Sequence, residues 1–479
     1  MVANMKILYV TSEASPYVAS GGLGDVMGSL PAAVKASLGE GSEVAVILPL
    51  YAQIAEEHRA RMEKVTEFHF FHAWRRAYAG IYKLTNGEGV TYYFIDNEQY
   101  FLRSSMYGQY DDGERYAYFG QAVVEFMLHT RFIPDVLHAN DWQSALSVIY
   151  PKLRYHMCEE LHGMKTIFTI HNIEYQGRYD IRSAGDVFDI EHKDIGILEY
   201  MGDVNLLKAA VVCADAVTTV SPTYAGELRH DYFAYGMEHI IRVFGFKMHG
   251  ILNGLDTAYF DPRKNDIPVP FSPETVTEGK AANKAHLQRT LGLREEADVP
   301  LVAMVTRLTE GKGVDLVLHV FEELMREKIQ FVLLGTGDER YERVFVTLCE
   351  RYGDRARAVL RFDRALSKEI YAAADIFLMP SRTEPCGLAQ MIACRYGAVP
   401  VVHGVGGLRD TIVPYNEEGS LGFVFRNYNA HDMLFRLKEA IALYGTKEEW
   451  QDLIKRAIEA DFTWKTSAEA YIRLYQSQI

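Results

Sequence analysis

The sequence has little that would mark a membrane, disulfide-stabilised or zinc-binding protein. It contains no run of about 18 to 20 apolar residues, the length that a bilayer span requires. Its five cysteines include no CxxC pair, so neither a disulfide framework nor a structural metal site is expected. The short apolar run near the N-terminus is followed by polar residues and predicts a first buried strand rather than a signal peptide. These observations favour a cytoplasmic protein.

Basic clusters and common nucleotide-binding motifs are also missing. The net charge is −14 and Lys and Arg are scattered, so no nucleic-acid or anionic-membrane partner is expected. The chain has no Walker loop, no GxGxxG and no DxD triplet, and therefore no obvious motif for a metal held on a diphosphate. What the 479 residues do contain is the composition of an ordinary globular protein, with 48% hydrophobic and 24% charged residues.

Short, continuous apolar runs alternate with longer segments of helical spacing. Runs of this kind are typical of strands buried on both faces of a parallel sheet, and the alternation predicts doubly wound α/β domains. The runs occupy residues 6–12, 43–51, 91–96, 134–140, 165–172, 216–221, 248–254, 300–307, 330–335, 358–362, 375–381 and 399–404.

Twelve strands are too many for one such domain, so we divide the chain into two. The prediction is a Rossmann-like domain over residues 1–246 and a second over 247–455. A C-terminal helix within 456–479 could pack back on either half. Two such domains would present a central cleft at the carboxyl ends of their strands, where these folds bind ligands.

Three strand-to-helix loops carry candidate chemistry. In "YVASGGLGDV" the glycines let a ligand approach the backbone beside a helix N-terminus, although a tight turn without a ligand fits equally. In "VTRLTEGKGVDLV" the cations Arg307 and Lys312 form a plausible diphosphate clamp, the alternative being an exposed basic loop. In "PSRTEPCGL" the carboxylate of Glu384 is suited to accept hydrogen bonds from ligand hydroxyls. The alternative is that its charge only interacts favourably with the dipole of the next helix.

Two further strand ends gather polar groups. "HANDWQSA" (138–145) includes Asp141, and "IHNIEYQG" (170–177) includes His171. A lone histidine is more often structural, but polar groups at several strand ends of one domain favour a ligand site.

These motifs resemble, in order and over nearly the whole chain, those of bacterial glycogen synthases and plant starch synthases. The matching stretches are "SGGLGDV", "HANDWQ", "TIHNIEYQG", "VTTVSPTYA", "ILNGLD", "VTRLTEGKG", "PSRTEPCGL" and "GGLRDTI". The resemblance implies a GT-B fold and a retaining glycosyltransferase that moves glucose from ADP-glucose to the non-reducing end of an α-1,4-glucan, with no organic cofactor and no metal.

The resemblance also implies roles for individual residues. Arg307 and Lys312 would grip the donor diphosphate, Glu384 would hold the donor glucose, and His171 would contact the sugar near its reacting carbon. The remaining positions that match the family's substrate-binding residues are Ser20, Gly21, Gly22, Asp25, Asp141, Asn253, Cys386, Gly387 and Leu388.

One departure stands in the glycine loop. The family has Lys-x-Gly-Gly-Leu there, whereas this chain has Ala19 at the lysine position. Three alternatives follow: an active enzyme with a weaker grip on its donor, a relative that uses UDP-glucose or another donor, or an engineered or strain-specific change. A weakly active or inactive glucan-binding paralogue is a further alternative. The presence of Arg307, Lys312 and Glu384 favours an active enzyme, and "EPCGL" argues against a sugar-nucleotide epimerase.

Overall fold

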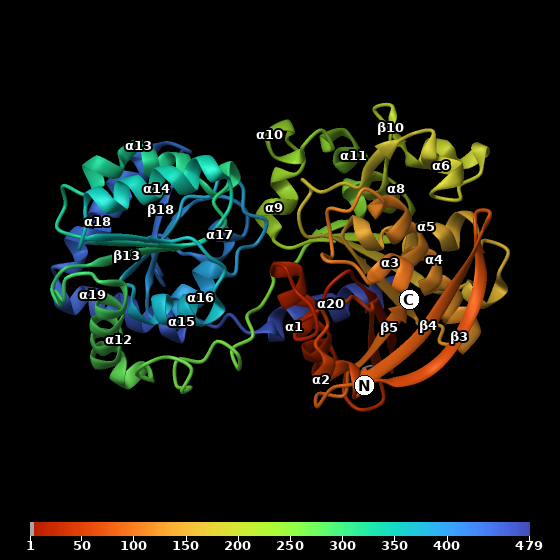
Figure 1. Ribbon diagram of the computed structural model, residues 1–479, viewed down its shortest axis with the longest axis horizontal. Coiled ribbons are helices and arrows are strands. Elements are labelled where there is room, and N and C mark those ends of the chain that lie inside the picture. The colour runs from red at the N-terminus through yellow and green to blue at the C-terminus, as the bar shows by residue number, and fades with distance from the viewer. Residues whose placement is uncertain (1–3) are drawn as a thin grey trace. The chain divides into compact units, whose positions relative to one another are not determined.

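Two α/β units make up the computed structural model, which describes residues 4–479 (Figure 1). Unit 1 contains the residues up to Gly254 together with Trp464–Ile479, and unit 2 contains Leu255–Thr463. No helix within the described residues is long and apolar enough to cross a membrane.

The division between the units lies later than the sequence predicted, at Gly254 rather than residue 246. The reason is the strand Met248–Gly250, which pairs with Ala216–Thr219 and so extends the first sheet. The second boundary is also later, at Thr463 rather than 455, because the helix Lys447–Glu459 belongs to unit 2. The final helix, Trp464–Gln478, packs against the first helix of unit 1, Gly22–Leu38.

Unit 1 is built on a mostly parallel sheet of nine strands within residues 4–254, in the order β12-β11-β7-β6-β1-β2-β5-β4-β3. The nine strands are β1 (Lys6–Val10), β2 (Glu43–Pro49), β3 (Glu63–His72), β4 (Arg75–Thr85), β5 (Thr91–Asp96), β6 (Val136–Asn140), β7 (Lys165–Ile170), β11 (Ala216–Thr219) and β12 (Met248–Gly250). A small second sheet contains β8 (Arg178–Asp180), β9 (Glu199–Tyr200) and β10 (Asp203–Asn205).

The helices of unit 1 connect these strands. Contacts pair α1 with α20 and α5 with both α4 and α8. They are α1 (Gly22–Leu38), α2 (Glu56–Arg59), α3 (Glu98–Phe101), α4 (Asp112–Thr130), α5 (Leu146–Leu153), α6 (Ser183–Asp186), α7 (Ile195–Leu198), α8 (Leu206–Cys213), α9 (Pro222–Glu227), α10 (Asp231–Ala234), α11 (Glu238–Val243) and α20 (Trp464–Gln478).

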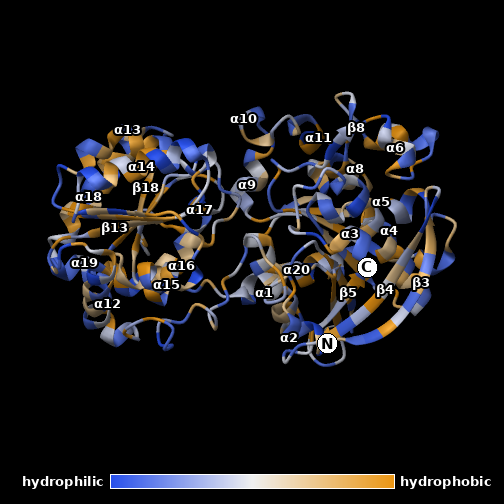
Figure 2. Cartoon of the chain, viewed as in Figure 1, coloured by the Kyte–Doolittle hydropathy of each residue, from blue (hydrophilic) through white to orange (hydrophobic). Residues whose placement is uncertain are grey.

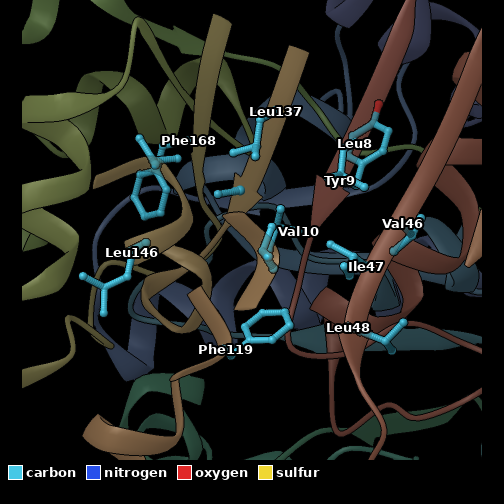
Figure 3. Close-up of a cluster of buried hydrophobic side chains, with 14 of the residues drawn as sticks. Leu8, Tyr9, Val10, Val46, Ile47, Leu48, Phe119, Leu137, Leu146 and Phe168 are labelled. Atoms are coloured by element: carbon cyan, nitrogen blue, oxygen red, sulfur yellow. The ribbon is translucent and has the colours of Figure 1, made fainter. Parts of the chain in front are cut away.

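The core of unit 1 lies between its central strands and the covering helices. Figure 3 shows a cluster of buried side chains that includes residues of β1, β2, β6 and β7 together with Phe119 of α4 and Leu146 of α5. All of these side chains are buried, and burial of this apolar surface is the main favourable contribution to folding. Most of the continuous apolar runs noted in the sequence are therefore strands covered on both faces, as expected for parallel sheets; β12 and β15 are only partly buried.

Unit 2 repeats this architecture with six parallel strands within residues 255–463, in the order β15-β14-β13-β16-β17-β18. The strands are β13 (Leu301–Val305), β14 (Gln330–Leu334), β15 (Ala356–Val359), β16 (Ile376–Met379), β17 (Val399–His403) and β18 (Phe423–Phe425). The helices are α12 (Val276–Leu291), α13 (Val314–Leu324), α14 (Glu339–Arg351), α15 (Arg364–Ala373), α16 (Ala389–Arg395), α17 (Gly406–Thr411), α18 (Ala430–Tyr444) and α19 (Lys447–Glu459).

The helices of unit 2 form a layer on each face of its sheet. Figure 1 shows α13, α14 and α18 on one face and α12, α15, α16 and α19 on the other. The strands are hydrophobic, whereas the helices carry hydrophilic residues on part of their surface (Figure 2). Each of the twelve predicted runs forms a strand, which confirms the two-domain α/β fold class.

Candidate active site

The glycine loop of unit 1 joins β1 to α1 and exposes its backbone. Gly21 is the N-cap of α1, makes no side-chain cap, and is exposed together with Ser20 and Gly22. A methyl group added at Gly21 or Gly22 would meet no atom within 4 Å. The first turn of a 17-residue helix is thus open to a ligand, and its N–H groups favour an anion.

A buried carboxylate that the sequence analysis missed holds this loop in place. Glu13 is 4% exposed, and its carboxylate accepts hydrogen bonds from the Ser20 backbone N–H, the Ser20 hydroxyl (3.1 Å) and the Tyr107 hydroxyl (3.0 Å). Burial raises the pKa of Glu13, and these bonds oppose the rise. Glu13 follows the end of β1 by three residues. Other polar residues were selected from the sequence because they follow a strand, and the same signal could have identified Glu13. Asp25, in the first turn of α1, accepts a bond from the Ser15 hydroxyl (3.3 Å).

Asp141 and His171 come together at the carboxyl ends of β6 and β7. The backbone N–H of His171 donates to Asp141 Oδ1 at 2.8 Å. Asp141 has a positive φ of 58°, an uncommon conformation for a residue with a side chain. Burial raises the pKa of Asp141 to about 7, although backbone bonds from His171 and Asn172 lower it. This carboxyl group is therefore partly protonated at neutral pH.

His171 is held as a neutral imidazole of defined tautomer. Burial lowers its pKa to about 3. Its Nε2 lies 2.9 Å from Asn140 Oδ1, and the Asn140 amide nitrogen donates to the carbonyls of Val10 and His138. Those two carbonyls orient the amide so that its oxygen faces the ring, and Nε2 must then carry the proton. Asn140 was noted in the sequence but was not predicted as a site residue.

Asn253 follows β12 and is also buried in unit 1. Its side-chain oxygen is enclosed and accepts no hydrogen bond from any residue in the described part of the chain. A buried acceptor without a donor is rare in native proteins. Asn253 is therefore a buried polar group whose acceptor the described part of the protein does not satisfy.

In unit 2, Lys312 and Glu384 form an ion pair at the carboxyl edge of the sheet. Lys312 follows β13, Glu384 follows β16, and these two strands are neighbours. Lys312 Nζ lies 2.7 Å from Glu384 Oε2, and the Ser381 hydroxyl donates to the same oxygen at 2.9 Å. Both protein bonds go to one oxygen, which leaves Oε1 available to a ligand.

Arg307 lies in the same loop as Lys312 but makes no contact with the pair. Its side chain is exposed, and no carboxylate within residues 4–479 pairs with its guanidinium. An unpaired guanidinium at a strand end is suited to bidentate binding of phosphate. Of the three charged residues predicted for this domain, Lys312 and Glu384 are in contact, whereas Arg307 is exposed to solvent.

The loop after Glu384 is held by hydrogen bonds to its backbone. Cys386 is buried, Gly387 has a φ of 74°, and Leu388 is the N-cap of α16. The Gln390 amide donates to the carbonyls of Cys386 (3.1 Å) and Gly387 (2.9 Å). These bonds hold the predicted substrate-binding segment in one conformation.

The chain is similar to known proteins over nearly its whole length. Residues 6–243 match the starch synthase catalytic domain family, and residues 292–460 match the glycosyl transferases group 1 family. The chain is 43% identical to a glycogen synthase of Clostridium novyi over 483 residues, covering 99% of each chain. It is 44% identical to a glycogen synthase of Streptococcus equi subsp. equi over 479 residues, covering 99% of this chain and 100% of that one. The chain belongs to the glycogen and starch synthase family.

Solved structures agree with this membership of the glycogen and starch synthase family. The catalytic domain of starch synthase IV from Arabidopsis thaliana, bound to ADP and acarbose, is 31% identical with a TM-score of 0.90, covering 99% of both chains. A sucrose-phosphate synthase from Thermosynechococcus elongatus, 17% identical with a TM-score of 0.60, covers 99% of both chains and shares the fold alone. The chain is a glycosyltransferase with the two-domain GT-B fold.

Proposed function

We propose that this glycogen synthase homologue transfers glucose from ADP-glucose to the non-reducing end of an α-1,4-glucan with retention of configuration. The observation that carries the proposal is the group of charges after β13 and β16, in a chain whose relatives are glycogen synthases. A paired lysine and glutamate beside an unpaired arginine supply one anion for sugar hydroxyls and cations for a diphosphate. ADP bound to the Arabidopsis starch synthase supports an adenine nucleotide as the leaving group.

In this proposal, the residues of unit 2 stabilise the charge that develops on the leaving group. The bond from glucose C1 to the diphosphate oxygen breaks, and Arg307 and Lys312 neutralise the diphosphate as it leaves. The acceptor hydroxyl oxygen bonds to C1 on the same face, and its proton passes to the leaving phosphate oxygen. Glu384 orients the glucose through its open oxygen and does not act as a nucleophile.

The residues of unit 1 act as neutral polar groups in the same transfer. With a pKa lowered to about 3, His171 is a neutral imidazole near pH 7, and we assign it no role as a general acid. It instead presents a fixed imidazole to the sugar. The N–H groups in the first turn of α1, which begins at Gly22, would favour the donor phosphates.

Alanine at position 19 removes one cation that the family pattern places beside the donor. A charge-assisted contact contributes about 1.5 to 3 kcal/mol, which corresponds to about one to two decades in rate or affinity. Arg307 and Lys312 remain to bind the diphosphate. We therefore expect an active enzyme with a raised donor KM.

Glucose incorporation into glycogen from labelled ADP-glucose and UDP-glucose tests the proposal. The wild type is expected to prefer ADP-glucose, and Ala19→Lys is expected to lower the donor KM about tenfold or more. Preference for UDP-glucose would overturn the assignment of the donor. No transfer from either donor, even by Ala19→Lys, would overturn the catalytic proposal in favour of a glucan-binding protein.

A further inference from the structure

The loop that carries Glu384 is enclosed by backbone from both neighbouring strand ends. β16 lies between β13 and β17 in the sheet, so the loop after β16 has a neighbour on each side. Gly313, after β13, lies so close to Pro380 that an added Cβ would stand 1.9 Å from the Pro380 carbonyl oxygen. Arg382 N–H donates to the Gly311 carbonyl at 3.0 Å on the same side.

On the other side, the turn Gly406–Gly407 at the start of α17 touches the backbone of Glu384 itself. A Cβ at Gly406 would lie 1.9 Å from the Glu384 carbonyl oxygen, and one at Gly407 would lie 2.1 Å from that of Cys386. The Gly407 N–H donates to the Glu384 carbonyl at 3.1 Å. Backbone atoms cannot move aside as a flexible side chain can, so only glycine allows this approach.

The same turn is tied to the rest of the Glu384 loop through Gln390. The Gln390 amide donates to the carbonyls of Cys386 and Gly387 and to the Thr411 hydroxyl of α17 (3.1 Å). Thr411 in turn donates to the Gly407 carbonyl at 2.6 Å. The carbonyls of Glu384, Cys386 and Gly387 are thus all fixed by groups on α16 and α17.

We propose that the Gly406–Gly407 turn is a positioning element that sets the distance between Glu384 and Lys312. It acts through the Glu384 backbone, and a shift of that backbone by a few tenths of an ångström would lengthen the 2.7 Å pair. The inference rests on the proposed function, because it assigns the pair a role in glucose transfer.

Gly407→Ala is the sharpest test, and Gly422→Ala is its matched control. Gly407 has no positive φ, so the substitution adds only the contact with Cys386. A Cβ at Gly422 would meet the Pro400 carbonyl at 2.4 Å, a clash of the same kind at the amino-terminal end of β17. Both variants are expected to lower Tm by similar amounts.

We expect Gly407→Ala to lower kcat at least tenfold and Gly422→Ala to lower it less than twofold. Each is assayed well below its Tm, and calorimetric titration with ADP checks that the number of binding sites per chain stays that of the wild type. This check excludes a loss of folded protein as the cause. Equal kcat for the two variants, at equal Tm, would overturn the proposal.

A readout without turnover separates this inference from the proposed function. Acetylation of Lys312 by an amine-reactive ester, followed by peptide mass spectrometry, reports on its pairing with Glu384. Gly407→Ala is expected to speed Lys312 acetylation at least threefold, with no change in Gly422→Ala. An unchanged Lys312 rate in Gly407→Ala would overturn the positioning role even if the wild type transferred glucose normally. Faster acetylation in a protein that transfers no glucose would keep the geometric inference and refute the function.

Discussion

Replacing Asp141 with asparagine should stabilise the protein at alkaline pH. The wild-type residue is half-buried, and desolvation raises the pKa of its carboxyl group to about 7, well above the ordinary value of 3.8. Folding therefore opposes its ionisation, and the folded state loses stability as pH rises from about 4 to about 7. An asparagine oxygen can still accept the His171 N–H, and it carries no charge to bury.

The expected magnitude follows from the pKa shift. Each unit of pKa difference corresponds to about 1.4 kcal/mol. From pH 5 to pH 8 the advantage of Asp141→Asn should grow by up to about 3 kcal/mol, because the wild type continues to lose stability until pH reaches the folded pKa. For a domain of 150–250 residues each kcal/mol corresponds to about 2–4 °C in Tm, so the advantage should grow by up to roughly 6–12 °C.

Differential scanning calorimetry of both proteins at pH 5 and pH 8 measures this change. Asp215→Asn is the control of opposite sign. Burial raises the pKa of Asp215, but bonds from Thr166 and the ion pair with Lys152 outweigh burial and leave the pKa below its ordinary value. A lowered pKa stabilises the fold at all pH values above the ordinary one. Asp215→Asn should therefore lower Tm by a similar amount at pH 5 and pH 8.

An advantage of Asp141→Asn that did not grow between pH 5 and pH 8 would refute the reasoning. So would a variant less stable than the wild type at pH 8, since burial of the charge would then not be the dominant effect. The expected result would mean that unit 1 keeps a destabilising, partly desolvated carboxyl group next to His171. Strained or perturbed groups of this kind cluster at functional sites.

Three further predictions concern the site and its support. Lys312→Met should lower kcat by about 10²-fold or more, because it removes a cation that stabilises the charge developing on the leaving diphosphate. The double variant Lys312→Met/Glu384→Gln should recover thermal stability but not glucose transfer. Asn140→Leu leaves the buried Nε2–H of His171 without an acceptor, at a cost of about 1–3 kcal/mol, and should lower kcat about tenfold in steady-state assays. Tyr475→Phe breaks the bonds of α20 to Tyr9 (2.9 Å) and His138 (2.8 Å); it should lower Tm by a few degrees and leave kcat unchanged.

Most of the parallel strands were predictable because they are buried on both faces and form one apolar run in the sequence. The parallel strand β18 was not predicted, because its three residues are too few to stand out. The hairpin of β3 and β4 escaped notice for the converse reason. In the edge strand β3 buried and exposed positions alternate, and in both β3 and β4 charged side chains interrupt the apolar pattern. The strands β8, β9 and β10 have two or three residues each, too few to produce a periodic signal.

The candidate site was predictable only as a set of strand ends. Polar residues after β6, β7, β13 and β16 were recognised from their position, because ligands bind at that edge of an α/β sheet. The contact of Lys312 with Glu384 was not, since it depends on β13 and β16 being neighbours although β14 and β15 lie between them in sequence. The resemblance to the family supplied the residue roles, which the geometry alone does not assign.

The most direct test of the central claim is the anomeric configuration of the bond that the enzyme forms. A maltooligosaccharide of defined length is incubated with ADP-glucose carrying ¹³C at glucose C1, and the product is followed by NMR. The account predicts one new α-1,4 linkage at the non-reducing end, with the label in the α configuration. A β-linked product, or labelled glucose released without chain extension, would contradict it.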